Sequence, residues 1–82
     1  MLSVACIPAF NAENQINDVI KKSLNYVDKV LVCDDGSTDN TFENAKLTGA
    51  YVLKHEKNLG KGAALKTLFT KAKELNADII IT

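Results

Sequence analysis

The stretch VLVCDDGSTD, residues 30–39, constrains the fold more than any other part of the sequence. Four apolar residues stop abruptly at two adjacent carboxylates, and a glycine, two hydroxyls and a third acid follow. An unbroken apolar run of this kind indicates a buried parallel strand that is covered on both faces. Gly36 allows a tight turn, and residues 37–40 are all good N-caps. The stretch therefore predicts a strand, a turn and a helix.

Asp34 and Asp35 stand where this strand leaves the sheet. A capped strand–turn–helix junction needs no ligand, because Asp39 or Asn40 alone could cap the helix. A cap uses only one short polar residue, however, and three carboxylates within six residues repel one another unless solvent or a donor-rich ligand relieves them. Ligands of open α/β sheets bind outside the carboxyl ends of strands. We therefore favour a binding site that includes Asp34, Asp35 and Gly36.

The remaining apolar segments predict three more strands and two more helices. The strands are expected at residues 2–7, 50–53 and 78–81, and apolar residues recur at helical spacing after residues 14 and 62. Pro8 cannot donate to a sheet, so it is expected to mark the end of the first strand. Each crossover is long enough to be right-handed. The order βαβαβαβ predicts a three-layer α/β fold with a parallel sheet.

The composition excludes several classes of partner. Eighty-two residues are enough for one small domain, which we assign to residues 1–82. Ten basic and ten acidic residues cancel, so nothing indicates nucleic acid or an anionic membrane as a partner. No apolar run approaches the length of a membrane span, and no signal peptide is visible. These features favour a cytoplasmic protein.

The cysteines and the single histidine give weak signals. Cys6 and Cys33 lie inside apolar runs and are interpreted as small buried hydrophobes, which agrees with a reducing, cytoplasmic setting. His55 is the only histidine and follows a predicted strand. A histidine in such a place is more often solvated or structural than catalytic.

A second polar turn, residues 58–62, precedes the last predicted helix. Gly60 and Gly62 flank Lys61, so a phosphate could approach the backbone at the helix N-terminus while the lysine neutralises its charge. A flexible solvated turn is an equal alternative, because the glycine spacing is not that of a Walker A loop. Phe10, after the first strand, could stack on a base, although a plug for the end of the core is the simpler interpretation.

Three stretches together resemble the N-terminal half of family 2 glycosyltransferases, inverting enzymes of the GT-A fold, and in particular the dolichyl-phosphate mannose/glucose synthase branch. They are IPAFN (7–11), VCDDGSTD (32–39) and NLGKG (58–62), in the expected order along the chain. The resemblance implies a Rossmann-like half of a GT-A fold with a site for a nucleotide-diphosphate sugar of the UDP or GDP type. It places Pro8, Phe10 and Asn11 in the nucleoside pocket, Asp35 at the base with Asp34 at the same edge, and Gly60, Lys61 and Gly62 beside the nucleotide.

The same resemblance implies that part of the enzyme is missing. The family carries a second acidic motif after the fourth strand, which holds Mg²⁺ or Mn²⁺ on the diphosphate, and its catalytic base lies further on. The sequence ends at Thr82, where that motif would begin, and residues 12–14 replace the usual paired glutamates. We therefore expect a truncated nucleotide-sugar-binding domain that binds no metal and has no transferase activity alone.

Other hypotheses about the fold and function of the chain stay open. A non-catalytic α/β module could use the same loops for a nucleotide or a protein. The spacing of Asp34 and Asp35 also fits a receiver-type domain, whereas a dinucleotide-binding domain is disfavoured because Pro8 and Phe10, rather than glycines, follow the first strand. If the fourth strand lies at an edge of the sheet, its unpaired N–H and C=O groups, or exposed apolar surface, could join two chains into a homodimer.

Overall fold

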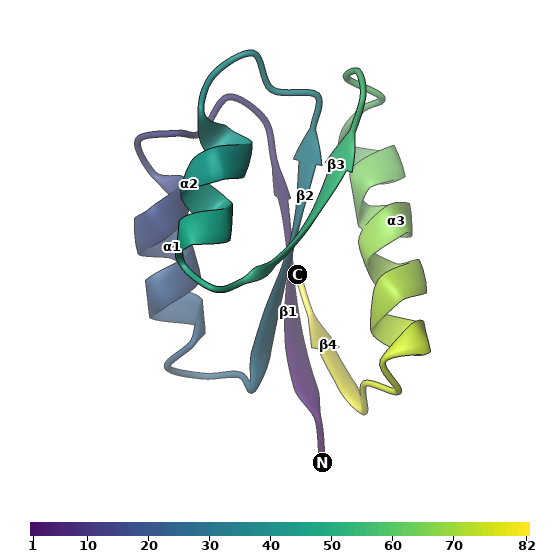
Figure 1. Cartoon of the computed structure of the whole chain (residues 1–82). Coiled ribbons are helices and arrows are strands. Elements are labelled where there is room, and N and C mark those ends of the chain that lie inside the picture. Colours follow the sequence, from purple (N-terminus) through teal and green to yellow (C-terminus); the bar gives the residue numbers. More distant parts are fainter.

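The computed structural model describes all 82 residues and has three layers (Figure 1). A four-stranded parallel sheet with the order β3-β2-β1-β4 lies between α1 and α2 on one face and α3 on the other. This confirms the predicted α/β class, layering and βαβαβαβ order. The elements are β1 (Ser3–Ala9), α1 (Ile16–Ser23), β2 (Lys29–Asp35), α2 (Thr41–Leu47), β3 (Tyr51–His55), α3 (Lys61–Glu74) and β4 (Ile79–Ile81).

The two central strands, β1 and β2, build a core on each face of the sheet. Successive side chains of a strand point to opposite faces, so every second residue contributes to the same core. On the α3 side the buried residues are Val4, Cys6, Leu31, Cys33, Ala64, Leu68 and Ala72. On the α1/α2 side they are Ala5, Ala9, Ile16, Ile20, Val30, Val32 and Ala45.

Both cysteines are free and buried, as expected from the apolar runs that contain them. Burial and, to a smaller extent, the nearby carboxylates of Asp35 and Asp34 raise the pKa of the Cys33 thiol to about 11. Burial also raises the pKa of Cys6. The thiols therefore stay protonated at neutral pH, and neither is an activated nucleophile.

The prediction that Pro8 ends the first strand is wrong. β1 continues to Ala9, with Pro8 opposite Cys33 and Ala9 opposite Asp34 of β2. On its other side β1 pairs with β4 only over residues 3–5. No strand lies beside Pro8 on that side, so an N–H at this position would have no sheet partner there. The proline is tolerated because β4 is short.

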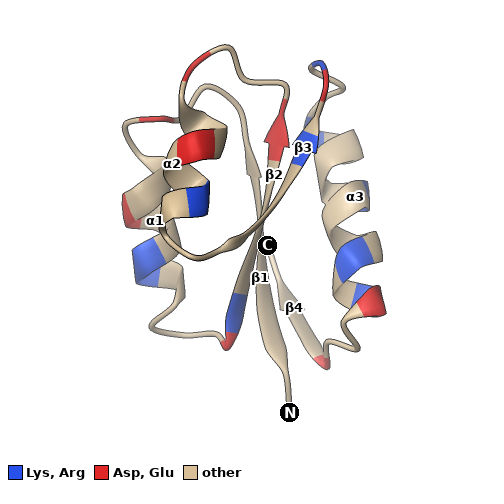
Figure 2. Cartoon of the chain, in the orientation of Figure 1, with Lys and Arg blue, Asp and Glu red and all other residues tan.

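The two edges of the sheet differ in character. At one edge β3 includes Lys54 and His55, and charged edge residues discourage strand addition. At the other edge β4 carries no charge (Figure 2), and its three isoleucines are each 38–46% exposed. The fourth strand thus lies at an edge, as the dimer hypothesis requires. None of the helices has the length and apolar character needed to cross a membrane.

Candidate functional site

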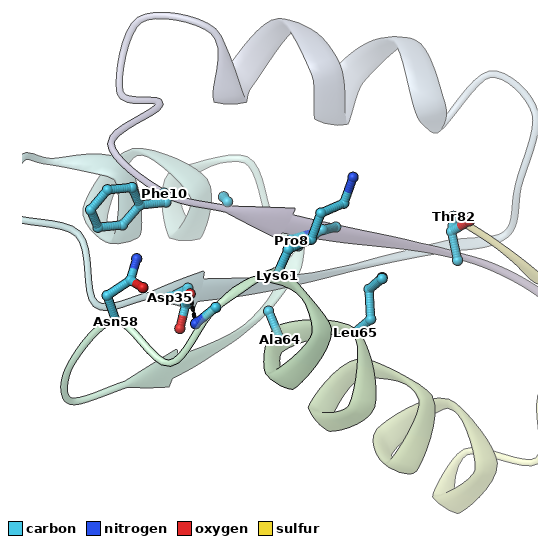
Figure 3. A pocket seen from close by; sticks show the side chains of 10 residues that line it. Pro8, Phe10, Asp35, Asn58, Lys61, Ala64, Leu65 and Thr82 are labelled. Atoms are coloured by element: carbon cyan, nitrogen blue, oxygen red, sulfur yellow. Dashed lines mark hydrogen bonds between the residues drawn. The ribbon is translucent and has the colours of Figure 1, made fainter.

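A cleft of about 720 Å³ opens at the carboxyl ends of β1 and β2, on the α3 side of the sheet (Figure 3). One wall is the end of β1, and the other is the loop before α3 together with the first turns of that helix. This is the end of a parallel sheet at which α/β proteins bind ligands. The lining residues are Pro8, Ala9, Phe10, Asp35, Asn58, Gly60, Lys61, Ala64, Leu65 and Thr82.

The two adjacent carboxylates, Asp34 and Asp35, do not share this cleft. Asp35 lines it, on the same face of β2 as Leu31 and Cys33. Asp34 is absent from its lining, because consecutive residues of a strand point to opposite faces. The sequence prediction placed both at one pocket edge, and the structure brings only Asp35 to it.

Asp35 is buried and accepts three hydrogen bonds. Its Oδ1 accepts from the Leu59 N–H at 2.9 Å and from His55 Nδ1 at 2.8 Å, and its Oδ2 accepts from the Gly60 N–H at 2.9 Å. The Leu59 N–H, followed by the His55 side chain, holds the pKa of Asp35 below its ordinary value. Each carboxylate oxygen can accept about two hydrogen bonds. Oδ1 is therefore fully used, and Oδ2 keeps one position for a ligand.

The helix α3 begins at the cleft. Gly60 is its N-cap residue with a φ of +102°, a conformation that favours glycine. Lys61 is the first helical residue and lines the cleft, whereas Gly62 does not. The first N–H groups of a helix have no partner within it, so they and the lysine ammonium favour an anion here.

On the opposite face, the two loops that follow β1 and β2 are joined by hydrogen bonds. Asn11 lies outside the cleft, and its N–H donates to Ser37 Oγ at 2.8 Å while its Oδ1 accepts from the Thr38 N–H at 2.9 Å. Asn11 also has a φ of +49°. The structure thus gives Asn11 a role in joining these loops.

Asp39, the third acid of the turn, is used in the same junction. It accepts hydrogen bonds from both the backbone N–H and the hydroxyl of Thr41, and from the Glu13 N–H at 3.3 Å. The Thr41 hydroxyl is the main cause of the lowered pKa of Asp39. Asn40 is the N-cap residue of α2, yet its side chain makes no capping bond. The capped-junction interpretation therefore accounts for Asp39, while Asp35 alone opens to a cleft.

Asp34 lies beneath the turn at residues 36–38 and is only 1% exposed. Its Oδ1 accepts from the Ser37 N–H at 3.2 Å, and its Oδ2 has no hydrogen-bond partner. Groups of three or more His, Cys, Asp or Glu side chains that could hold a metal ion do not occur in the chain. Asp34 and its neighbours therefore do not form a metal-binding set.

Gly36 joins the two sides of the site without lining the cleft. Its φ is +74°, and a Cβ built on it would lie 2.3 Å from the carbonyl carbon of Lys57. The turn after β2 thus contacts the backbone of the loop before α3. Only glycine permits this close approach, so Gly36 allows the loop that carries Asn58 and Gly60 to pack directly against the turn after β2.

Sequence reasoning missed half of the cleft lining. Ala64 and Leu65 follow Lys61 by one helical turn, and helical spacing could have indicated that they share its face. Asn58 belongs to the polar turn 58–62, but no sequence signal singled it out as a site residue. Thr82 reaches the cleft because β4 pairs with β1, and no local signal in the sequence predicts that pairing.

The model of the family described as "Glycosyl transferase family 2" matches residues 4–82 of the chain. Among curated relatives, a UDP-N-acetylglucosamine–dolichyl-phosphate N-acetylglucosaminyltransferase of Methanococcus voltae is 35% identical, with 93% of this chain and 38% of that protein covered. An uncharacterized protein of Methanocaldococcus jannaschii is 42% identical, with coverage of 93% and 32%. The chain thus spans about a third of the length of these relatives.

Solved structures of glucosyl-3-phosphoglycerate synthase from Mycobacterium tuberculosis are similar in fold. One superimposes with a TM-score of 0.68 at 36% identity, covering 79% of this chain and 28% of the synthase. Another, a complex with Mn²⁺, UDP-glucose and phosphoglyceric acid, has a TM-score of 0.66 at 37% identity, with 78% and 27% covered. The similarity covers about four fifths of this chain and supports a shared fold.

Proposed function

The chain belongs to glycosyl transferase family 2, and from this premise we propose that its cleft binds the nucleotide of a nucleotide-diphosphate sugar. The observation that carries the proposal is the Asp35 carboxylate, which is fixed by three hydrogen bonds and keeps one acceptor position on Oδ2. A fixed acceptor in a cleft selects ligands that offer an N–H group there.

The chemistry of the cleft fits a nucleoside diphosphate. Uracil and guanine each carry a ring N–H from which Asp35 can accept a hydrogen bond. Pro8 and Phe10 supply apolar surface in the same cleft. Lys61 and the N-terminus of α3 offer positive charge to the diphosphate. We favour uridine, because the similar M. tuberculosis enzyme has been solved with UDP-glucose bound.

The site residues predicted from the sequence divide into two groups under this proposal. The first group would contact the ligand and comprises Pro8, Phe10, Asp35, Gly60 and Lys61. The second group would shape the loops around it and comprises Asn11, Asp34, Gly36 and Gly62, none of which lines the cleft.

We further propose that the 82-residue chain binds a donor without transferring its sugar. Asp35 is the only side-chain carboxylate that lines the cleft, and its hydrogen bonds and lowered pKa make it a poor general base. The solved complexes of the similar synthase contain Mn²⁺ with UDP-glucose or UDP, but no cluster of metal-ligating side chains exists here. We therefore assign no step of the reaction to a metal held by this chain.

Calorimetric titration with UDP, GDP, CDP and NAD tests the proposal. We expect binding of UDP to exceed that of CDP, whose cytosine lacks the ring N–H, and Asp35→Asn to weaken UDP binding by about tenfold, as expected for loss of a charge-assisted hydrogen bond.

The matched control is Asp34→Asn, because Asp34 neighbours Asp35 yet faces away from the cleft; we expect it to change the affinity less than about twofold. Equal UDP affinity of the wild type and a folded Asp35→Asn variant would remove Asp35 from the site and contradict the proposal.

Self-association through β4 stays a prediction. Two copies related by a twofold axis could pair their β4 edges and cover isoleucines that are 38–46% exposed. In sedimentation velocity runs, we expect dimer at high protein concentration and monomer for Ile80→Lys. A wild-type monomer at all concentrations would exclude this contact.

A further inference from the structure

His55 is a largely buried polar residue that lies behind the cleft rather than in its lining. Its side chain is 12% exposed and sits between two partners. Nδ1 lies 2.8 Å from Asp35 Oδ1, and Nε2 lies 2.9 Å from Thr67 Oγ1. The imidazole therefore links β3 to β2 and to the middle of α3.

We propose that His55 is a positioning residue, which holds the Asp35 carboxylate in the orientation that presents its free Oδ2 position to the cleft and thereby sets the preference for bases with a ring N–H. This inference rests on the proposed nucleotide site and names the group that determines its selectivity.

The other two partners of Asp35 cannot supply this orientation independently. The N–H groups of Leu59 and Gly60 belong to a loop that Asp35 itself helps to hold, so the loop and the carboxylate order each other. His55, by contrast, extends from the end of a strand and is anchored by a hydroxyl on α3. It is the only side-chain partner of Asp35 and the only partner fixed by two regular elements.

The hydrogen bonds also define which nitrogen carries the proton. An ionised carboxylate can only accept, so Nδ1 donates to Asp35. Nε2 then accepts from the Thr67 hydroxyl, with Cys33 Sγ 3.6 Å away. Both ring nitrogens of His55 therefore have a hydrogen-bond partner in this orientation of the ring.

The order carboxylate, imidazole, hydroxyl also occurs in acyl-transfer triads, but this site lacks the rest of that machinery. Thr67 lies well inside α3, where each backbone N–H donates to a carbonyl of the preceding turn. No N–H donors near its hydroxyl are left to stabilise an oxyanion. The geometry therefore favours a positioning role over a nucleophilic one.

Three variants separate positioning from simple packing. His55→Phe keeps a ring and removes both hydrogen bonds, His55→Asn places an amide donor near the former Nδ1, and Thr67→Val removes only the anchor. The ligand-free readout is the pH titration of the Asp35 carboxyl carbon by NMR, and the second readout is the ratio of UDP to CDP affinity.

We expect His55→Phe to raise the Asp35 pKa toward its ordinary value and to lower the UDP/CDP ratio by about fivefold, an amount typical of one lost hydrogen bond. His55→Asn should recover most of the ratio. Thr67→Val, which leaves the imidazole without its anchor, should give a ratio between those of His55→Phe and the wild type. A purely structural role would reduce stability but leave the ratio unchanged.

An unchanged Asp35 titration and an unchanged ratio in a folded His55→Phe variant would overturn the inference. If His55→Phe does not fold, a wild-type Asp35 titration and a wild-type ratio in the folded Thr67→Val variant would likewise overturn it. Failure of the wild type to bind UDP would contradict the proposed function instead, and the ligand-free titration would still decide whether His55 positions Asp35.

Discussion

The adjacent carboxylates of Asp34 and Asp35 lie on opposite faces of the sheet, in different surroundings. On the α1/α2 face, Asp34 lies under a closed junction in which side chains of one loop bind the backbone of the next. On the α3 face, Asp35 borders a cleft of about 720 Å³ and keeps one free acceptor position. Neighbouring residues of the same type thus take different roles because a strand alternates its side chains.

The comparison shows why one face carries a cleft with a free acceptor while the loops on the other face are bonded to each other. The closed face uses short polar side chains to satisfy its loop backbone internally, and the buried Asp34 Oδ2 is left without a partner. The open face satisfies its loop with the Asp35 carboxylate itself, and Asp35, which lines the cleft, keeps one unused acceptor position on Oδ2. Gly36 couples the two faces, because its turn contacts the backbone at Lys57 and Asn58.

Breaking the contact between the Gly36 turn and the backbone at Lys57 should have the largest effect on stability. Gly36→Ala would force a Cβ to within 2.3 Å of the Lys57 backbone at a φ of +74°. We expect the free energy of unfolding, measured by urea denaturation, to fall by about 3 kcal/mol. The Lys57 backbone must move away from the new Cβ, and the alanine must also adopt an unfavourable positive φ. The matched control is Gly49→Ala, which has a φ of +86° but open space around it, and should cost only about 1 kcal/mol. Equal losses would show that the contact between the loops is unimportant.

The neighbours Phe10 and Asn11 sharpen the comparison, because they stand at the end of the same strand with different roles. Phe10→Ala removes an exposed ring from the cleft and should weaken UDP binding by about fivefold, as expected for a lost stacking contact, with little effect on stability. Asn11→Ala removes the bond to the Thr38 N–H and should cost about 1 kcal/mol of stability while UDP affinity changes little. The reverse pattern in calorimetry and denaturation would contradict this division.

Acid should weaken both faces together. The pKa of Asp35 is lowered chiefly by the Leu59 N–H, and that of Asp39 chiefly by the Thr41 hydroxyl. Because both folded-state values lie below the unfolded ones, the stabilisation is complete above about pH 4 and is lost as the pH falls through the folded values. Thermal unfolding between pH 7 and pH 2 should show a falling midpoint only below about pH 4. Asp39→Asn should flatten this fall without changing UDP affinity at pH 7, and a fall that began near pH 6 would point to other groups.

The sequence alone determined the fold and the end of the sheet at which the cleft lies. The lengths of the apolar runs and the helical periodicity of the segments between them sufficed for the parallel three-layer arrangement, because these signals are local. The acids and glycines at the strand ends predicted a site at the edge of the sheet where the cleft opens. The three motifs indicated the family, which the comparisons confirm.

Only the tertiary structure decided which of the predicted site residues line the cleft and which join the loops around it. The face on which each aspartate lies depends on the strand register, and Pro8 continues β1 because β4 is short. The bond between His55 and Asp35 joins residues that are 20 positions apart, and Thr82 meets the cleft through strand pairing. Such contacts depend on how distant segments align, and a local pattern of residues carries no information about that alignment.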